Sequence, residues 1–347
     1  MSTMSASLES AAAFEASTLG FLYRQWITRR PPVPIGTNLN SQVAIITGSN
    51  SGLGLEAGRQ LLQLGLSHLI VAVRSTAKGE KAAESLRSEF HDAQISVWSL
   101  DMESYDSIKG FVEWCKSLPR IDIALLNAGL SGGPEFKTTE ATGHEHSFQV
   151  NYLSTMLLAI LLLPILKTKR ISGPKPPVLS IVTSDTAFWQ KLETPGPVLA
   201  EFDKPNAYDP FLWYGRAKLL QMLFITKLAQ EVNADDVVVN LANPGLCHSE
   251  FQRKDGTPTS AFWATVFTVF ITAVARSTAA GASTYVDAVV LKRQQSHGSY
   301  VSDWTIKPFP QLLYTQEGAD IQVRLWEETM EELHFAGVSD IIKHLRD

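Results

Sequence analysis

The chain has 347 residues, of which 45% are hydrophobic and 19% are charged, and its net charge is −5 at pH 7. Such a composition is that of a globular domain with a sizeable core, and an acidic balance without a basic cluster argues against a nucleic-acid partner. Two cysteines, Cys115 and Cys247, are too few for a disulfide framework or a metal-ligand spacing, so we expect a cytoplasmic protein without a metal site.

Residues 1–40 are predicted to be an N-terminal extension. Glu9 and Glu15 stand where a secretory signal needs a basic start and an apolar run, so no signal peptide is predicted. The extension continues as GFLYRQWITRRPPVPIG, which mixes aromatic and basic residues until the prolines end it. Two interpretations stay open: an arm packed on the domain or on a partner subunit, or a peripheral membrane contact. The most apolar run, 261–275, is too short for a span, because its helix would cover about 22 Å of roughly 30 Å of hydrocarbon.

From residue 42 the sequence alternates short apolar runs with runs of helical periodicity. Strands that are apolar throughout are typical of a parallel sheet covered on both faces, and right-handed crossovers make such a sheet doubly wound. We therefore predict an α/β fold of Rossmann type in one domain over 41–310, followed by a helical tail at 311–347. The predicted strands are 42–47, 68–73, 94–99, 121–126, 178–183 and 237–242, and the predicted helices are 53–64, 77–90, 105–117, 144–167 and 212–231.

The first strand runs into a glycine-rich turn, TGSNSGLG. Its glycines remove side chains where the backbone bends sharply and approaches a ligand, and the helix that follows aims unpaired N–H groups at an anion. An ordinary tight turn between strand and helix would look the same. We predict that the turn cradles the pyrophosphate of a dinucleotide through Thr47, Gly48, Ser49, Asn50, Ser51, Gly52, Leu53 and Gly54.

The second and third strands end in residues that bear on cofactor choice. Arg74 stands where NAD-preferring sheets place an acid, and an arginine there can meet a 2′-phosphate, with Lys78 one helical turn further on. The alternative is a solvated basic pair at a helix start. Asp101, beside Met102, either accepts a hydrogen bond from an adenine amino group or begins a loop. This pattern favours NADP(H) over NAD(H).

The glycine turn followed by Asn127-Ala128-Gly129 after the fourth strand resembles the short-chain dehydrogenase/reductase family. The resemblance extends over about 42–305, through Asn151 in a helix, Ser184 after the fifth strand, the YxxxK pair and a PG turn. Arg74 with the AKGE that follows, and Arg276, resemble the branch of retinol-dehydrogenase-like and WW-domain oxidoreductase-like members, which includes many fungal pathway enzymes. The resemblance adds Asn127, Ala128, Gly129, Tyr214, Lys218, Pro244, Gly245 and Ser249 to the predicted cofactor contacts.

The catalytic residues that the resemblance implies are Asn151, Ser184, Tyr214 and Lys218. Because Tyr214 and Lys218 are four residues apart on a helix, the ammonium can approach the phenol, and we expect it to lower the pKa of Tyr214. Lys218 would also hold the nicotinamide ribose. Ser184 would hydrogen-bond the substrate carbonyl oxygen, and Asn151 would serve a proton relay. We interpret Cys247 and His248 as residues lining the site, because neighbours in an extended segment point to opposite sides.

The segment 185–213 is longer than is usual in the family and contains four prolines. It is either a specificity loop at the rim or a tolerated surface insertion. Residues 257–275 are the apolar segment that covers substrate in the family, 277–291 read as a helix, and 297–303 as the last strand. The helices 144–167 and 212–231 would pair two subunits in a homodimer, which residues 1–40 could obstruct or extend.

We therefore expect an NADP(H)-dependent oxidoreductase that interconverts a ketone and a secondary alcohol. Because the two flanking segments are rich in Phe, Trp and Leu, the substrate is expected to be a bulky apolar or aromatic small molecule of secondary metabolism. Two other functions fit the same sheet. One is a cofactor-binding regulator without turnover, and the other is a non-redox acid–base catalyst such as a cyclase or dehydratase.

Overall fold

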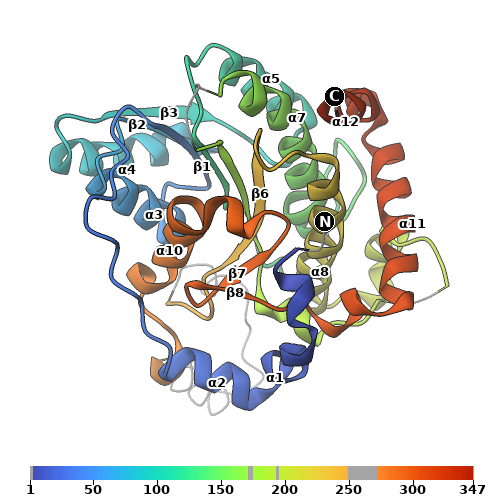
Figure 1. Cartoon of the computed structure of the whole chain (residues 1–347). Helices are drawn as coiled ribbons and strands as arrows, with labels where there is room; N and C mark the ends of the chain where they lie inside the picture. The colour runs from blue at the N-terminus through green and yellow to red at the C-terminus, as the bar shows by residue number, and fades with distance from the viewer. Residues whose placement is uncertain (1–2, 171–174, 193–194, 249–271, 347) are drawn as a thin grey trace.

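The computed structural model describes residues 3–170, 175–192, 195–248 and 272–346 and contains an eight-stranded sheet of order β3-β2-β1-β4-β5-β6-β7-β8 (Figure 1). Strands β1 to β7 run parallel, and β8 is antiparallel to β7. This order confirms the predicted doubly wound sheet. The strands are β1 (Val43–Thr47), β2 (His68–Val73), β3 (Gln94–Ser99), β4 (Ile123–Leu126), β5 (Val178–Val182), β6 (Val238–Asn243), β7 (Tyr300–Ser302) and β8 (Thr305–Lys307).

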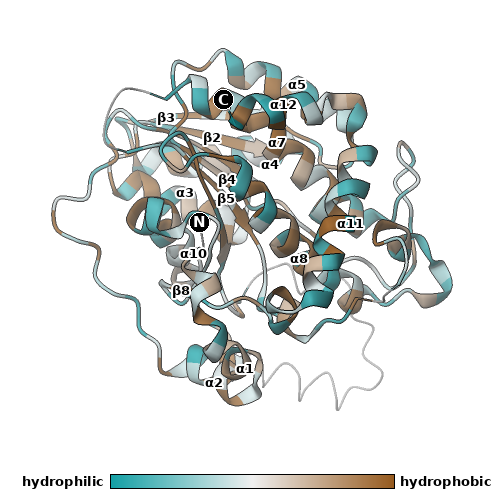
Figure 2. Cartoon of the chain, turned by 45° about the vertical axis from the view of Figure 1, so that its right-hand side comes forward, coloured by the Kyte–Doolittle hydropathy of each residue, from teal (hydrophilic) through white to brown (hydrophobic). Residues whose placement is uncertain are grey.

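Helices cover both faces of the sheet, and each face has its own apolar core (Figure 1). Because the central strands are buried on both faces, their side chains are apolar without alternation, as the brown strands in Figure 2 show. One layer is formed by α3 (Gly52–Gln63), α4 (Thr76–Glu89) and α10 (Thr278–Val286). The other is formed by α5 (Tyr105–Lys116), α7 (Ser154–Thr168) and α8 (Pro210–Leu228).

The observed elements start and end within two residues of most predicted ones, with two informative exceptions. The predicted helix 144–167 consists of α6 (His146–Phe148), a π-helical turn at Gln149–Leu153 and α7. Strand β8 was not predicted. It follows β7 through a two-residue loop in which Asp303 and Trp304 have φ of 53° and 59°, the conformation of a tight hairpin turn that favours glycine or asparagine.

The N-terminal extension packs on its own domain, which agrees with the first of its two interpretations. It contains a 3₁₀ helix at Ser5–Ala11, α1 (Ala12–Ala16) and α2 (Thr18–Trp26). The Ser5 hydroxyl donates to the carbonyl of Lys307 at 2.6 Å and accepts from the N–H of Tyr300 at 2.9 Å. The start of the chain is thereby attached to the last two strands.

The C-terminal tail is also part of the fold. Helix α11 (Gln316–Glu332) packs against α8, and α12 (Val338–Arg346) packs against α7. Trp326 stacks on Phe224 with ring centroids 4.9 Å apart. Helices α7 and α8, through which the homodimer was predicted to form, thus also pack against the chain's own C-terminal helices, and the homodimer stays a prediction.

Among the described residues, one helical stretch, His146–Thr168, is long and apolar enough to cross a membrane. Of its most apolar window, 89% is buried inside the protein. It is therefore a core helix, and its apolar composition reflects contacts with α5, α8 and α12 rather than with lipid.

Candidate active site

The glycine turn between β1 and α3 has the conformation that its glycines allow. Gly48 and Gly52 have φ of 65° and 57°, values that a residue with a Cβ rarely adopts. A Cβ on Gly54 would stand 2.5 Å from Nδ2 of Asn127 and 2.8 Å from the carbonyl oxygen of Gly48. A Cβ on Gly52 would meet nothing within 4 Å, so this side of the turn is open. The turn can be approached closely by a ligand.

Several residues predicted to touch the cofactor also make hydrogen bonds within the turn itself. Asn127 donates its side-chain amide to the carbonyl oxygen of Thr47 at 2.9 Å, and the N–H of Ala128 donates to the Thr47 hydroxyl at 2.8 Å. The Ser49 hydroxyl donates to the carbonyl of Ile46 at 2.7 Å. These bonds join the carboxyl ends of β1 and β4 and hold the backbone of the turn in place.

The start of α3 offers free donors. Its N-cap residue, Ser51, makes no side-chain capping bond, so the first N–H groups of the helix are available to a ligand. Asn50 is partly exposed and Ser51 exposed, while Leu53 packs against the core beneath α3. The turn therefore presents polar atoms outward and anchors itself by one apolar side chain.

The residues expected to choose between cofactors lie at the ends of β2 and β3. Arg74 is two-thirds exposed and forms an ion pair with Glu103, and Lys78 is exposed on α4. Asp101 accepts the N–H of Glu103 at 3.0 Å, a contact that begins a loop, and its contact with an adenine amino group stays a prediction. The Met102 side chain is buried in the core, so it is not the side chain that would meet a cofactor.

Ser184, Tyr214 and Lys218 come together at the carboxyl end of β5. Tyr214 and Lys218 lie on α8, and Ser184 caps the 3₁₀ helix at Asp185–Trp189. Ser184 hydrogen-bonds the hydroxyl of Tyr214. The Lys218 ammonium lies 5.5 Å from the centre of the Tyr214 ring and donates to the carbonyl oxygen of Val182 at 2.9 Å. Three residues that are distant in sequence thus share one site.

The pKa values of this pair differ from the expectation. Burial raises the pKa of Tyr214, the hydrogen bond from Ser184 opposes this, and the charge of Asp185 adds to it. In the chain without a ligand, burial therefore dominates and the pKa of Tyr214 lies above its ordinary value, while the lowering by Lys218 stays a prediction. Burial also lowers the pKa of Lys218 to about 7, since the ammonium is almost wholly removed from water.

Asn151 lies in the π-helical turn, beside the other three residues. Its side chain forms two hydrogen bonds with the backbone of Leu130, accepting the N–H at 3.0 Å and donating to the carbonyl at 2.7 Å. Gln221 donates to the Asn151 carbonyl at 2.6 Å. A Cβ on Gly129 would stand 2.8 Å from Oδ1 of Asn151 and 3.8 Å from Nζ of Lys218, so only glycine allows this closeness.

The PG turn after β6 closes the site. Gly245 has a φ of 73°, and its N–H donates to the side chain of Asn243 at 3.2 Å. Cys247 is buried against Pro244, and burial raises its pKa to about 12. A thiol of that kind is a poor nucleophile, which supports its interpretation as a lining residue. Ser249 and most of 257–275 lie outside the described residues.

Three residues that the sequence analysis did not select also reach this site. Arg24 and Gln25 of α2 approach Asp185 and the PG turn, and Asp185 directly follows Ser184. No local pattern marks them, because their partners are separated from them by more than 150 residues. A polar pair inside an otherwise apolar helix was the one available signal.

The sheet order, the glycine turn and the Ser–Tyr–Lys cluster define a dinucleotide-binding oxidoreductase of Rossmann type. Residues 42–182 match the family described as short chain dehydrogenase. The chain is 53% identical over 345 residues to the short chain dehydrogenase virL of Hypocrea virens, with 99% of each chain covered. It is 46% identical to the short chain dehydrogenase/reductase mfmJ of Annulohypoxylon moriforme, with 94% of each covered. The chain belongs to the short-chain dehydrogenase/reductase family.

Solved structures agree on the fold. L-sorbose reductase from Gluconobacter frateurii, in complex with NADPH and L-sorbose, superimposes with a TM-score of 0.57 at 22% identity, covering 77% of this chain and 96% of that one. A short chain dehydrogenase from Shigella flexneri 2a in complex with NADP gives a TM-score of 0.56 at 19% identity, covering 76% and 97%.

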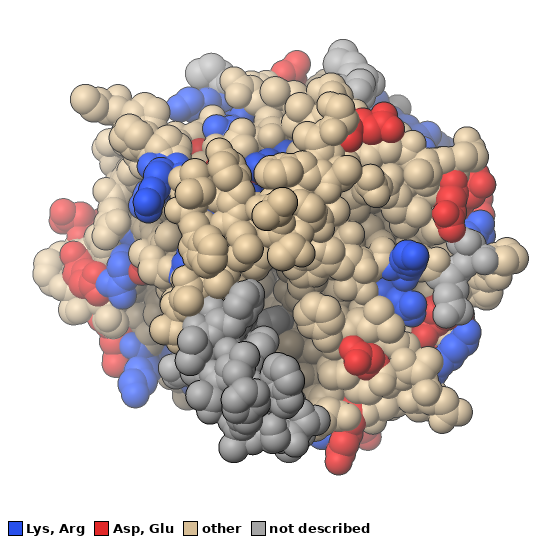
Figure 3. Space-filling view, turned by 90° about the horizontal axis from the view of Figure 1, so that it is seen from below, with Lys and Arg blue, Asp and Glu red and all other residues tan. Residues whose placement is uncertain are grey.

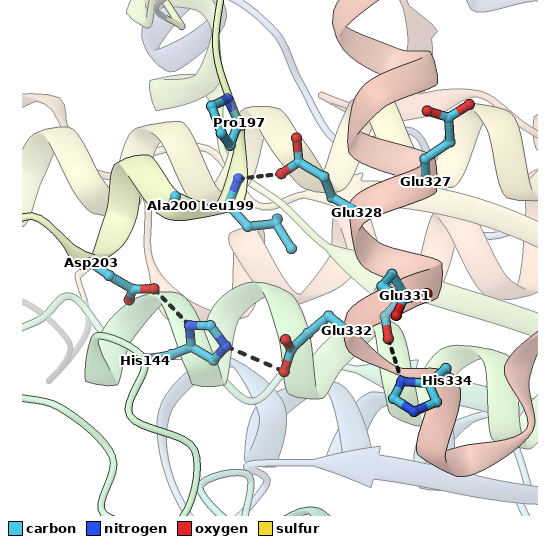
Figure 4. A pocket seen from close by; sticks show the side chains of 10 residues that line it. All are labelled: His144, Pro197, Leu199, Ala200, Asp203, Glu327, Glu328, Glu331, Glu332 and His334. Atoms are coloured by element: carbon cyan, nitrogen blue, oxygen red, sulfur yellow. Dashed lines mark hydrogen bonds and ion pairs between the residues drawn. The ribbon is translucent and has the colours of Figure 1, made fainter.

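A cavity of about 790 Å³ lies between α11 and the segment 197–203, and none of the four predicted catalytic residues lines it (Figure 4). At its edge, His144 bonds Asp203 through Nδ1 at 2.8 Å and lies 3.3 Å from Glu332 through Nε2. Glu328 accepts the N–H groups of Val198 and Leu199. These contacts attach the inserted segment 185–213 to α11. Among the described residues, no group of acidic, histidine or cysteine side chains could hold a metal ion.

Proposed function

We propose that the protein is an NADP(H)-dependent oxidoreductase that interconverts a ketone and a secondary alcohol on a bulky apolar or aromatic molecule of secondary metabolism. The observation that carries the proposal is the hydrogen-bonded Ser184–Tyr214 pair beside the buried Lys218 ammonium. The family and the fungal relatives support the reaction class. NADP-bound and NADPH-bound structural neighbours support the cofactor.

The residues present fit a dinucleotide. The open side of Gly52, the close packing behind Gly54 and the uncapped start of α3 make a cradle for a pyrophosphate. Among the described residues, the Val182 carbonyl is the acceptor of Lys218, which leaves ammonium donors for ribose hydroxyls. Arg74 would meet a 2′-phosphate by exchanging its exposed ion pair with Glu103. When bound, the nicotinamide supplies the hydride.

The chain's own residues handle the substrate oxygen and its proton. Because the hydroxyl groups of Ser184 and Tyr214 hydrogen-bond each other, both are close enough to hold one carbonyl oxygen. Tyr214 gives its proton to that oxygen in reduction and takes it back in oxidation. Lys218 adds positive charge at the moment the phenolate forms, and a pKa of about 7 lets it exchange protons near neutral pH. Asn151 holds Leu130 and the end of β4, so it positions the site.

The aromatic rim of the site supports the proposed substrate class. Phe188, Trp189 and Phe211 belong to the insertion, and the last two are about half exposed at the surface. Phe21 of α2 meets the Trp189 ring edge-on at 6.0 Å. An aromatic rim of this kind favours an apolar ring system over a sugar.

Incubation with NADPH and a panel of bulky apolar ketones, followed by both nicotinamide absorbance and product mass, tests the proposal. We expect alcohol product with matched loss of NADPH. Product without a change in absorbance would mean a non-redox catalyst, and NADPH binding without any product would mean a regulator. Either result would contradict the proposal.

We further propose that the protein is cytoplasmic and makes a peripheral membrane contact through the outer face of α2. Leu19, Tyr23, Trp26 and Ile27 follow helical spacing and are 49–75% exposed, and basic residues follow the helix. Seen from below, the face on which α1 and α2 lie carries few charges at its centre (Figure 3). Sedimentation with phosphatidylcholine–phosphatidylserine vesicles should capture the protein but not the L19S/I27S variant. The α11 surface variant Val323→Ser is the matched control and should be captured like the wild type. Equal capture of L19S/I27S and the wild type would contradict the membrane contact.

A further inference from the structure

A cluster of six charged side chains is buried where the N-terminal arm meets the active site. Its three acids and three bases balance, and five of the six are less than 10% exposed. Arg24 donates to Oε2 of Glu15 at 2.6 Å, and Lys307 lies 2.7 Å from Oε1 of the same residue. Arg276 pairs with Asp303 and also donates to the carbonyl of Arg24. The members of this arm cluster are Glu15, Arg24, Asp185, Arg276, Asp303 and Lys307.

Asp185 joins the arm cluster to the catalytic residues. Its carboxylate lies 3.6 Å from Nη2 of Arg24, and its backbone follows directly on Ser184. Asp303 lies 3.7 Å from Nε of the same arginine, held there by a hairpin turn in which it has a positive φ. A buried carboxylate without a cation is costly, so Arg24, together with Arg276, stabilises the charged form of Asp185 beside Ser184.

Helix α2 buries polar side chains and exposes apolar ones, the opposite of an ordinary surface helix. Its buried side carries Arg24 and Gln25, whereas its exposed side is apolar. Gln25 donates to the carbonyls of Leu246 at 2.8 Å and Val274 at 3.0 Å. Its Oε1 lies 2.8 Å from where a Cβ of Gly245 would stand. One turn of α2 therefore contacts the residue after Ser184 and the PG turn together.

We propose that α2 is a resident part of the active site, in which Arg24 positions Asp185 and, through it, the Ser184–Tyr214 pair. The inference rests on the proposed function, because it concerns the same reaction. Arg24 is a positioning residue, since it reaches the reacting groups only through Asp185. The arm is thus required for turnover and not only for packing.

The physical consequence concerns proton transfer at Tyr214. The negative charge of Asp185 disfavours the phenolate. The positive charge of Arg24, 3.6 Å from that carboxylate, opposes the effect of Asp185. When Arg24 is lost, Arg276 still favours the carboxylate form of Asp185. The negative charge then acts on Tyr214 without the opposing charge of Arg24, so the pKa of Tyr214 rises further and the limb of the pH–rate profile that reports this residue moves to higher pH in either direction of the reaction. The groups that face Asp185 are Arg24 on α2, Arg276 ahead of α10, Asp303 in the hairpin, Tyr300 on β7, Tyr214 on α8 and Cys247 after β6.

The first experiment needs no substrate. Unfolding temperatures are measured for Arg24→Gln, for Asp185→Asn and for the double variant. Each single change leaves an unbalanced buried charge and should lower the temperature by at least about 3 °C. The double variant should lose clearly less than the sum. If the two losses of unfolding temperature add up in the double variant, Arg24 and Asp185 do not interact, and the proposal is overturned. This test does not depend on the substrate of the enzyme.

The second experiment separates positioning from packing. Glu15→Gln combined with Arg24→Gln restores the charge balance of the arm cluster without restoring the Arg24 charge beside Asp185. We expect this variant to recover stability but keep the limb shifted by about one pH unit and turnover lowered about tenfold, with NADPH affinity within threefold. Adding Asp185→Asn to this double variant should return the limb to its wild-type position. Leu19→Ser alone, on the outer face of α2, should leave the wild-type pH–rate profile unchanged. A wild-type profile in Glu15→Gln/Arg24→Gln would overturn the proposal, whereas a wild type without turnover would instead contradict the proposed function.

Discussion

The cofactor side and the substrate side of this molecule are held together in different ways. On the cofactor side, β1 to β4 pair in register, and the glycine turn is fixed by short hydrogen bonds between neighbouring strand ends. On the substrate side, segments from both ends of the chain meet through buried charges and side-chain bonds. Ser5 and Tyr300, for example, are 295 residues apart.

The difference shows which parts of the site can be predicted from a short stretch of sequence. The cofactor side depends on backbone shape, so it is written locally in glycines and short polar residues. The substrate side depends on charge pairs between distant elements, so no short stretch reveals it. Mutations should therefore act by steric conflict on the first side and by unpaired charge or lost proton transfer on the second.

The largest effect is expected at the junction of the two sides. Tyr214→Phe removes the proton donor but keeps the ring, so turnover should fall by at least about 100-fold, the usual range for a general acid. NADPH binding, followed by fluorescence, should be almost unchanged. A variant within threefold of wild-type turnover would remove Tyr214 from the acid–base role.

A steric test of the cofactor side comes next. Gly54→Ala places a Cβ 2.5 Å from the Asn127 amide, so the turn must shift and NADPH affinity should fall by at least about tenfold. The matched control is Gly110→Ala on α5, where a Cβ meets nothing within 4 Å and helix propensity improves. Titration of both variants decides the question. Equal affinities would mean that the turn does not shape the site.

Cofactor choice should depend on one exposed side chain. Arg74→Asp places a negative charge where a 2′-phosphate would lie, so the preference for NADPH over NADH should fall by about tenfold. Lys81→Asp makes the same charge change further along α4 and serves as the control. Comparison of kcat/KM for the two cofactors gives the ratio. An unchanged ratio in Arg74→Asp would show that Arg74 does not contact the phosphate.

The smallest expected effect concerns the attachment of the insertion to α11. Burial alone lowers the pKa of His144, but its bonds to Asp203 and Glu332 outweigh this and raise the pKa to about 9. A raised pKa stabilises the fold fully below pH 6.5, and the gain is lost as pH rises through 9. The free energy of unfolding of the wild type should therefore exceed that of His144→Gln by about 1 kcal/mol at pH 6. The two free energies should be equal near pH 10, as measured by urea unfolding. A constant difference across this range would contradict the ion pair.

Sequence reasoning worked best where residue type and backbone geometry are directly linked. The strands, the glycine turn and the cluster of Ser184, Tyr214 and Lys218 were predicted, and the structure brings those three side chains together. Sequence reasoning did not predict that Asn127 donates a hydrogen bond to the Thr47 carbonyl, or that the Asn151 side-chain amide hydrogen-bonds the backbone of Leu130. Polar side chains at a strand end can face a ligand or the backbone, and only the packed structure selects one.

The sequence by itself determined the doubly wound sheet and its cofactor turn, because periodicity and glycine placement act over a few residues. Only the tertiary structure decided that α11 and α12 pack against α8 and α7. It likewise decided that Arg24 and Asp185 meet beside Ser184. Burial free energies and Coulomb interactions depend on distance in space, and the order of residues along the chain does not contain that distance.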